Sequence, residues 1–178
     1  MSVSVELVGL SSYAKANFFR WRNDPKVWKW CRQNGPLSQA AHDSYWYKTE
    51  LDHSSRFFAL KDNLPKIGGD IVGCAGLTSI DLVNSRAEFS LYIGPEHHGK
   101  GYGTDGLKAL FSWGFGYLNL NSIWGESFDG NPALRIFDKL NLSRDGIRRD
   151  FYFRDGRYID AHLVSVKRNE WEQSMLRW

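Results

Sequence analysis

The most informative part of this chain is the segment Gly94-Pro95-Glu96-His97-His98-Gly99-Lys100-Gly101-Tyr102-Gly103-Thr104. The apolar run Phe89–Ile93 precedes it and predicts a strand, and apolar residues at helical spacing predict a helix from Gly103 to about Leu118. A glycine-rich turn at a helix start points several backbone N–H groups in one direction, and the helix dipole adds to their attraction for phosphate oxygens. The segment therefore predicts a domain that binds a phosphorylated ligand through its backbone.

Three kinds of phosphate-binding loop match parts of this segment, and a plain connecting turn is the fourth alternative. The first is the loop of nucleotide triphosphatases, which Gly94-x-x-x-x-Gly99-Lys100 matches in most positions. That loop then needs Ser or Thr to hold magnesium, and Gly101 stands there instead. A nucleotide triphosphatase is therefore disfavoured.

The second alternative is the dinucleotide fingerprint, which Gly101-x-Gly103-x-x-Gly106 matches, with Glu126 at a plausible distance. That fingerprint starts at the end of a strand and belongs to a series of βαβ units. Here residues 95–98 intervene, and no second βαβ unit follows. A lone pattern of this kind is a weak signal, so this alternative is also disfavoured.

The third alternative is the pyrophosphate loop of the GNAT acetyltransferases, Arg/Gln-x-x-Gly-x-Gly/Ala. The segment His98-Gly99-Lys100-Gly101-Tyr102-Gly103 resembles it, with His98 in place of the first residue. A second segment, Asn131–Leu142, resembles the family pattern Asn-x-x-Ala-x-x-Tyr-Glu-Lys-x-Gly-Phe, with Phe137 at the tyrosine and Asn141-Leu142 at the last two positions. The GNAT loop is the interpretation that we carry forward.

Other segments resemble one branch of this family. Residues 145–149 and 155–160 are similar to the tail of the enzymes that acetylate ribosomal-protein N-termini and similar amines. Residues 21–27, with His42 and Trp46 behind them, resemble amino-sugar nucleotide N-acetyltransferases, and residues 80–84 ahead of 87–89 add to that likeness. The resemblance covers most of the chain and is specific for the superfamily rather than for a substrate.

Composition indicates one globular domain, residues 1–178, with 42% hydrophobic and 24% charged residues. The net charge of +3 and the scattered bases do not call for nucleic acid, and the cluster Arg148, Arg149 and Arg154 is expected to be a solvated face. Cys31 and Cys74 lack a CxxC pattern, so no metal site is expected. With neither a signal peptide nor a membrane-spanning run, we expect a cytoplasmic protein; a homodimer is left open.

The predicted elements follow the order strand, helices, three strands, helix, strand, helix and hairpin. This order indicates an α/β (mixed α+β) protein with helices on both faces of one sheet. The resemblance implies the GNAT fold, a mostly antiparallel mixed sheet of about six to seven strands with a splay between two central strands. The expected segments are strand 3–8, helices 11–23 and 38–51, strands 56–60, 70–79 and 87–93, helix 103–118, strand 123–128, a helix from 131, and strands 151–153 and 158–166.

The resemblance implies acetyl-coenzyme A as co-substrate, with its pyrophosphate wrapped by Gly99–Thr104 and its pantetheine arm beside the strand end at Leu91–Ile93. Asn131 corresponds to a residue that contacts the pantetheine end in relatives, although a helix cap is the plainer role. The coenzyme residues that we expect are Leu91, Tyr92, Ile93, His98, Gly99, Lys100, Gly101, Tyr102, Gly103, Thr104, Asn131 and Phe137.

Acetyl transfer to an amine needs a base for the amine, donors for the oxyanion, and a proton or dipole for the leaving thiolate. Glu88 and Glu126, on strands beside the expected splay, are the candidate bases, with ion-paired surface residues as the alternative. His42 and His53 are outside candidates for the base. A free backbone N–H between Ser90 and Ile93 would stabilise the oxyanion.

The acid departs from the family pattern, because neither Phe137 nor Ala133, at the positions where relatives have Tyr or Ser, can donate a proton. Ser90, Ser127, Tyr92 or a water are the alternatives, and an inactive chain is another. Ser90 is our candidate.

The expected acceptor pocket consists of Trp21, Arg22, Asn23 and Trp46, where Arg22 could hold a phosphate or carboxylate; core packing is the alternative for Trp21. The function predicted is acetyl-CoA-dependent N-acetylation of a primary amine on a small molecule such as an amino-sugar nucleotide. The alternatives are a protein N-terminus as acceptor, and an inactive coenzyme A-binding module.

Overall fold

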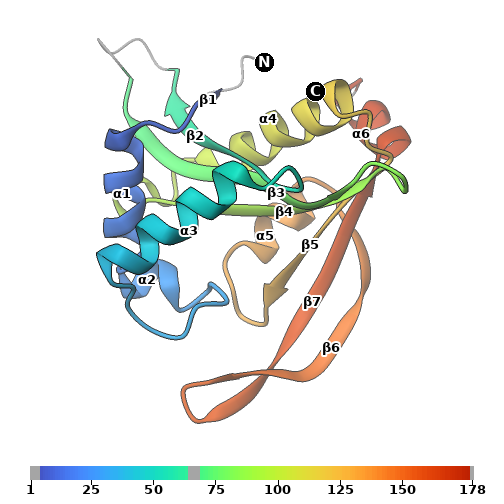
Figure 1. The fold of residues 1–178 in the computed structure, drawn as a ribbon. Coiled ribbons are helices and arrows are strands. Elements are labelled where there is room, and N and C mark those ends of the chain that lie inside the picture. Colours follow the sequence, from blue (N-terminus) through green and yellow to red (C-terminus); the bar gives the residue numbers. More distant parts are fainter. Residues whose placement is uncertain (1–4, 64–68, 177–178) are drawn as a thin grey trace.

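The computed structural model describes residues 5–63 and 69–176. Its helices lie on both sides of one mixed sheet (Figure 1). The elements in chain order are β1 (Val5–Val8), α1 (Ser12–Arg22), α2 (Pro25–Trp28), α3 (Gln39–Leu51), β2 (Arg56–Asp62), β3 (Ile71–Asp81), β4 (Arg86–Ile93), the 3-10 turn η1 (Pro95–His97), α4 (Tyr102–Tyr117), β5 (Ser122–Phe128), α5 (Leu134–Lys139), β6 (Ser143–Arg154), β7 (Arg157–Lys167) and α6 (Arg168–Met175).

The described strands form a seven-stranded sheet in the order β1-β2-β3-β4-β5-β7-β6. Every neighbouring pair is antiparallel except β4 and β5, which are parallel. The sheet is therefore mixed and mostly antiparallel, which confirms the predicted fold class. Of the expected first strand, Val3 and Ser4 lie outside the described residues.

The two parallel strands separate soon after they meet. They pair at only three positions, which end at Glu88 opposite Trp124, although β4 continues to Ile93 and β5 to Phe128. The ring of Phe89 occupies the space that a side chain at position 125 would need, since a Cβ atom on Gly125 would clash with it. The predicted splay is present, and it opens on the carboxyl-terminal side of Glu88.

Two apolar clusters cover the two faces of the sheet. One packs α4, α5 and α6 against the strands and includes Phe89, Phe111, Phe137 and Trp171. The other packs α1 and α3 against the opposite face and includes Phe18, Trp21, Trp46 and Tyr92. Alternate residues of β4 point to opposite faces of the sheet, so Glu88, Ser90 and Tyr92 lie on the α1–α3 side.

The C-terminal hairpin is longer than the sequence predicted. Strand β6 begins at Ser143, not at Phe151, and bulges interrupt its pairing with β7 between Arg144 and Gly146 and between Arg148 and Tyr152. These bulges break the two-residue alternation by which a strand is recognised. The predicted turn at Asp155-Gly156 is present, with positive φ at both residues (49° and 78°), and the turn end of the hairpin projects beyond the other strands of the sheet (Figure 1).

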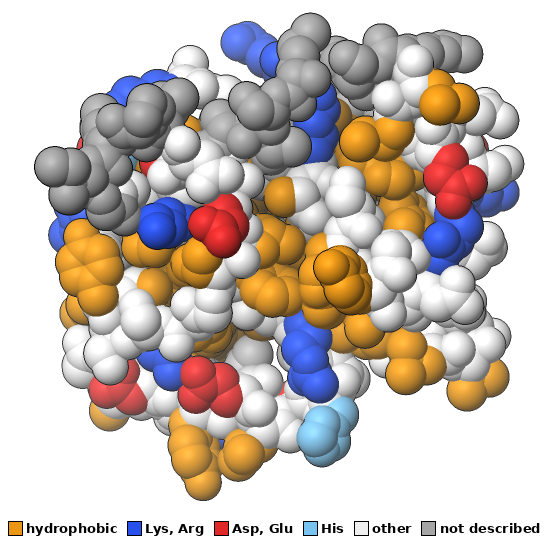
Figure 2. Space-filling view, turned by 90° about the horizontal axis from the view of Figure 1, so that it is seen from above, with side chains coloured by type: hydrophobic (Ala, Val, Ile, Leu, Met, Phe, Trp, Pro, Cys, Tyr) orange, Lys and Arg blue, Asp and Glu red, His pale blue; other side chains and the backbone are white. Residues whose placement is uncertain are grey.

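Charged side chains are distributed over the surface. On the face seen in Figure 2, Lys and Arg side chains lie scattered among hydrophobic and neutral ones and do not gather into a single patch. This distribution agrees with the small net charge of +3.

Candidate active site

The glycine loop presents its backbone as predicted. Gly99 and Gly101 have φ angles of 74° and 92°, in the left-handed region that favours glycine. Within the described part of the chain, no protein group accepts a hydrogen bond from the amides of residues 99–104. These six N–H groups at the start of α4 are therefore available to an anion.

A cavity of about 630 Å³ lies against this loop. Of the expected coenzyme residues, all line it except Lys100 and Phe137. Lys26 and Lys29, which the sequence analysis did not single out, also line it and add positive charge on the side of α2. Because free amides and lysines face one cavity, it fits the phosphates of coenzyme A.

The edge of β4 beside the gap carries unpaired backbone groups. Gly94 donates its N–H to the carbonyl of Val72 on β3 over 2.9 Å. Because backbone groups alternate between the two sides of a strand, Leu91 and Ile93 direct theirs toward β5, which has already separated. His98 Nε2 lies 2.9 Å from the Ile93 carbonyl oxygen and donates to it. By the same alternation, the N–H groups of Leu91 and Ile93 face the gap.

A second cavity of about 580 Å³ lies on the α1–α3 side of the sheet. The residues that line both cavities are Trp30, Cys31, Leu91, Tyr92, Asn131 and Ala133. The two cavities therefore meet at the β4–β5 gap. We call them the coenzyme-side cavity and the acceptor-side cavity.

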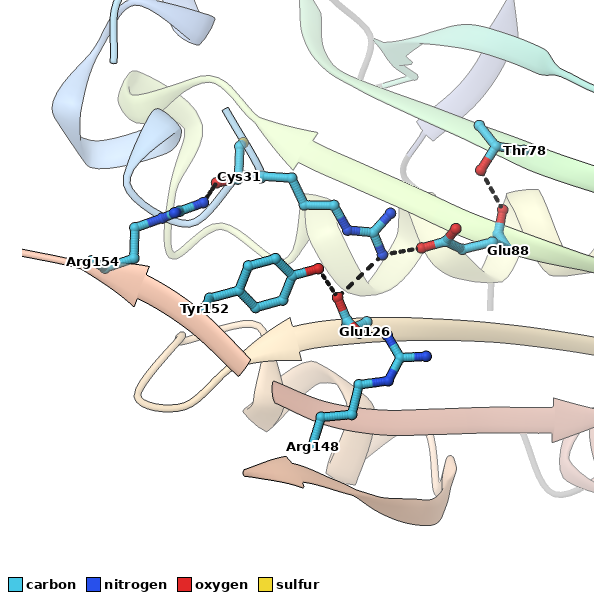
Figure 3. Close-up of polar contacts among 8 residues, drawn as sticks. Cys31, Thr78, Glu88, Glu126, Arg148, Tyr152 and Arg154 are labelled. Carbon is cyan, nitrogen blue, oxygen red and sulfur yellow. Dashed lines mark hydrogen bonds and ion pairs between the residues drawn. The ribbon is translucent and has the colours of Figure 1, made fainter. Parts of the chain in front are cut away.

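Both candidate bases lie at the acceptor-side cavity and are bridged by one arginine (Figure 3). Nη2 of Arg32, from the segment between α2 and α3, donates to Oε1 of Glu88 and, over 3.3 Å, to Oε1 of Glu126. From β6, Arg148 Nη1 donates to Oε2 of Glu126 over 2.7 Å, and the hydroxyl of Tyr152 donates to Oε1 over 2.5 Å.

The two carboxylates differ in what remains free. The Glu126 side chain is 1% exposed, and both of its oxygens accept hydrogen bonds. Glu88 is 11% exposed, and among the described residues its Oε2 has no hydrogen-bond partner. Glu88 can therefore take a proton without breaking an existing contact, whereas Glu126 cannot.

Tyr152 acts as a donor in this network. Burial and the hydrogen bond to Glu126 raise the pKa of Tyr152, so its hydroxyl stays protonated. Arg32 stays charged, because burial lowers its pKa but the hydrogen bond and the charge of Glu88 outweigh that effect. Arg32 thus keeps its positive charge between the two strands.

The serines considered as the acid, and the residues around them, lie near the gap in different environments. Phe137 is buried edge-to-face against Phe89 at 5.4 Å and lines the acceptor-side cavity. Ser90 and Ser127 line the same cavity, and the buried Oγ of Ser127 has no hydrogen-bond partner within the described residues. Asn131 accepts a hydrogen bond from the amide of Ala133 over 3.0 Å, so it caps this turn while it lines both cavities.

The four expected acceptor residues fall into two groups. Arg22 and Trp46 line the acceptor-side cavity. Trp21 is 1% exposed, lines neither cavity, and donates its indole N–H to Glu96 over 3.0 Å. The Asn23 side chain bonds both the N–H and the C=O of Leu37. Trp21 thus lies in the core, because the inward face of α1 packs on the sheet. Asn23 instead holds the segment before α3 through its two hydrogen bonds to Leu37.

Several residues at the site were missed or misjudged from sequence. Arg32 and Tyr152 gave no local signal. Arg148, expected on a solvated face, pairs with the buried Glu126, and Arg154 lies over the rings of Phe128 and Tyr152 at 5.0 and 5.7 Å. A signal was available in the aromatic run Phe151–Phe153, which lies between these arginines on β6, because aromatic faces attract guanidinium groups.

Among the described helices, none is long and apolar enough to cross a membrane. In residues 5–63 and 69–176, no three His, Cys, Asp or Glu side chains are grouped so that they could hold a metal ion.

Comparison with known proteins agrees with this geometry. Residues 5–141 match the acetyltransferase (GNAT) domain family. The uncharacterized N-acetyltransferase p20 of Bacillus licheniformis is 32% identical over 57% of this chain and 58% of its own length. The spermidine N(1)-acetyltransferase of Escherichia coli K12 is 30% identical over 67% of this chain and 62% of its own length. The matches thus span about three fifths of these two relatives.

A solved structure extends the likeness to the whole fold. The spermidine N-acetyltransferase of Vibrio cholerae, in complex with CoA and spermine, superposes with a TM-score of 0.88. It covers 96% of this chain and 99% of its own, at 21% sequence identity. The predicted GNAT fold is therefore confirmed. On these grounds the chain belongs to the GNAT acetyltransferases, a family that takes its acetyl group from acetyl-CoA.

Proposed function

We propose that this chain transfers an acetyl group from acetyl-CoA to a primary amine on a small molecule. The observation that carries the proposal is the meeting of two cavities at the β4–β5 gap, one beside six free backbone amides and the other beside two carboxylates. Holding both substrates in adjoining cavities supplies proximity, which can lower the barrier by several kcal/mol.

The coenzyme-side residues hold the donor. The amides of Gly99–Thr104 bind the pyrophosphate, and Lys26 and Lys29 add positive charge. Acetyl-CoA, when bound, supplies an activated thioester carbonyl. The N–H of Leu91 faces the gap, where a donor stabilises the negative charge that develops on a carbonyl oxygen.

The acceptor-side residues handle the protons. Oε2 of Glu88 accepts the proton from the amine, directly or through water, while Arg32 holds the other oxygen in place. Glu126 orients Arg32 together with Tyr152 and is a positioning residue.

The leaving sulfur needs a hydrogen-bond donor. Ser127 is better placed than Ser90 for this role, because its buried hydroxyl is unpaired among the described residues and lines the cavity beside Phe137.

The acceptor class follows from the shape of its cavity. Aromatic rings line it, from Trp30, Tyr45, Trp46, Phe57 and Tyr92, and its acidic residues are the paired Glu88 and Glu126. A cavity lined by aromatic rings suits a small molecule, whereas a protein N-terminus would need an extended acidic groove. Two small acceptors are to be compared: an amino-sugar nucleotide, and spermidine, which appears in the names of similar acetyltransferases.

Two measurements test this function. Isothermal titration with acetyl-CoA should show binding, and a thiol-release assay over spermidine, an amino-sugar nucleotide and an N-terminal peptide should show turnover with a small amine. Binding without turnover on any amine would favour an inactive coenzyme-binding module. Absence of coenzyme binding would refute the proposal altogether.

A further inference from the structure

Arg22 is the unbalanced charge of the acceptor-side cavity. Four charged side chains line this cavity: Arg22, Arg32, Glu88 and Glu126. Both carboxylates pair with arginines, whereas Arg22 has no acidic partner among the described residues. A part-buried charge is normally paired, so an unpaired one in a cavity suggests that a ligand supplies the opposite charge.

The neighbours of Arg22 do not supply that charge. Its guanidinium lies 5.5 Å from the centre of the Tyr92 ring. Burial raises the pKa values of Tyr92 and Cys31, and the charge of Arg22 only partly offsets this, so both groups stay neutral. Burial also lowers the pKa of His42 and Arg22 adds to that effect, while Asp43 opposes it; an imidazole supplies no negative charge in either protonation state.

The arginine is held ready for a partner. Its Nε donates to Oε1 of Gln33 over 2.6 Å, and the amide of Gln33 donates back to the carbonyls of Arg22 and Gly35 over 2.7 and 2.9 Å. Within the described residues, neither Nη nitrogen has a hydrogen-bonded protein acceptor. The side chain is therefore oriented through Nε while its two Nη groups stay free, the arrangement that a bidentate anion needs.

We propose that Arg22 binds a carboxylate or phosphate group of the acceptor molecule while its amine lies beside Glu88. This subsite rests on the proposed function and names the acceptor class, an amine that also carries an anion. Both residues line one cavity of about 580 Å³, a size that holds a small metabolite. A polyamine, which carries only positive charge, gains nothing from Arg22 and is repelled by it.

Inorganic phosphate tests the subsite directly. Calorimetry is run on protein saturated with coenzyme A, so that the amides of the glycine loop are occupied. Phosphate should bind the wild type, and its affinity should fall about 10- to 100-fold in Arg22→Gln, the range expected for a hydrogen-bonded charge pair. Arg22→Lys should recover part of the loss.

A matched variant and a second readout separate the subsite from general effects. Lys48→Gln removes one positive charge from the exposed side of α3, outside the cavity, and should leave phosphate binding unchanged. In turnover, glucosamine 6-phosphate should be preferred over glucosamine, and an amino acid over its amide, with the preference lost in Arg22→Gln through KM.

The outcomes distinguish the two proposals. If phosphate does not bind the coenzyme complex, or binds Arg22→Gln as tightly as the wild type, the subsite is wrong even where amines are acetylated. If phosphate binding depends on Arg22 but no amine is acetylated, the subsite stands and the proposed transfer fails. Preference for spermidine over every anionic amine would overturn the subsite.

Discussion

Glu88 and Glu126 should respond differently to the same conservative substitution. Glu88→Gln keeps the size of the side chain but removes the oxygen that accepts a proton in the cavity. General bases contribute about 10²- to 10⁴-fold to enzyme rates, so kcat should fall within that range. Because Glu88 lies outside the coenzyme-side cavity, affinity for acetyl-CoA should not change.

Glu126→Gln should mainly cost stability. A glutamine side chain has an NH2 group in place of one of the two oxygens that now accept hydrogen bonds from Arg32, Arg148 and Tyr152. At least one charged hydrogen bond is therefore lost, which lowers the free energy of unfolding by about 1.5–3 kcal/mol. The side chains of Arg32 and Arg148 are 53% and 42% exposed and can be hydrated instead, which favours the lower part of that range. At about 2–4 °C per kcal/mol for a domain of this size, Tm should fall by about 3–6 °C.

Three measurements on the two variants decide the matter. Thiol release gives kcat, calorimetry gives the Kd of acetyl-CoA, and thermal denaturation gives Tm. The reasoning is refuted if Glu126→Gln slows turnover more than Glu88→Gln at an unchanged Tm, or if Glu88→Gln keeps the wild-type kcat.

Three other substitutions probe the loop, the leaving group and the pH response. Gly101→Asp should abolish coenzyme binding in calorimetry, because φ is 92° there and a carboxylate would repel the pyrophosphate; unchanged affinity would mean that the loop has been misassigned. Ser127→Ala should lower kcat about tenfold at constant coenzyme affinity, and more than Ser90→Ala does, as expected for one hydrogen bond; equal effects would remove Ser127 from its role. Burial opposes ionisation of Glu96, but hydrogen bonds from the backbone and from side chains outweigh burial and lower the pKa of Glu96 to about 2. The ionised Glu96 therefore contributes fully to stability above its usual pKa of 4.5, and this contribution is lost as pH falls toward 2. Glu96→Gln should therefore flatten the fall of Tm between about pH 5 and 3, and an unchanged slope would contradict this.

The sequence predicted those parts of the site whose signal is local. Glycines at alternate positions before a helix predict positive φ angles and unpaired amides, and both features are present at Gly99 and Gly101. Glu88 and Glu126 were predicted as bases because both lie on strands that flank the predicted splay, and both line the acceptor-side cavity. Asn141, at the position of a family glycine, adopts the left-handed conformation (φ 54°) that asparagine tolerates.

The missed residues depend on contacts between distant segments. Arg32 meets Glu88 and Glu126 across 56 and 94 residues of sequence, and Tyr152 reaches Glu126 only because β7 and β6 follow β5 in the sheet. Periodicity along the chain carries no information about such pairs. Trp21 was ambiguous for a related reason, since an aromatic residue on an amphipathic helix suits a cavity or a core equally well. Cytoplasmic location and homodimer formation stay predictions.

The most direct test of the account is a crystal structure of the chain with coenzyme A. We expect pyrophosphate oxygens within hydrogen-bond distance of the amides of residues 99–104, and the thiol end in the gap between β4 and β5, near the N–H of Leu91. A coenzyme bound elsewhere, or one whose thiol end stays outside that gap, would contradict it.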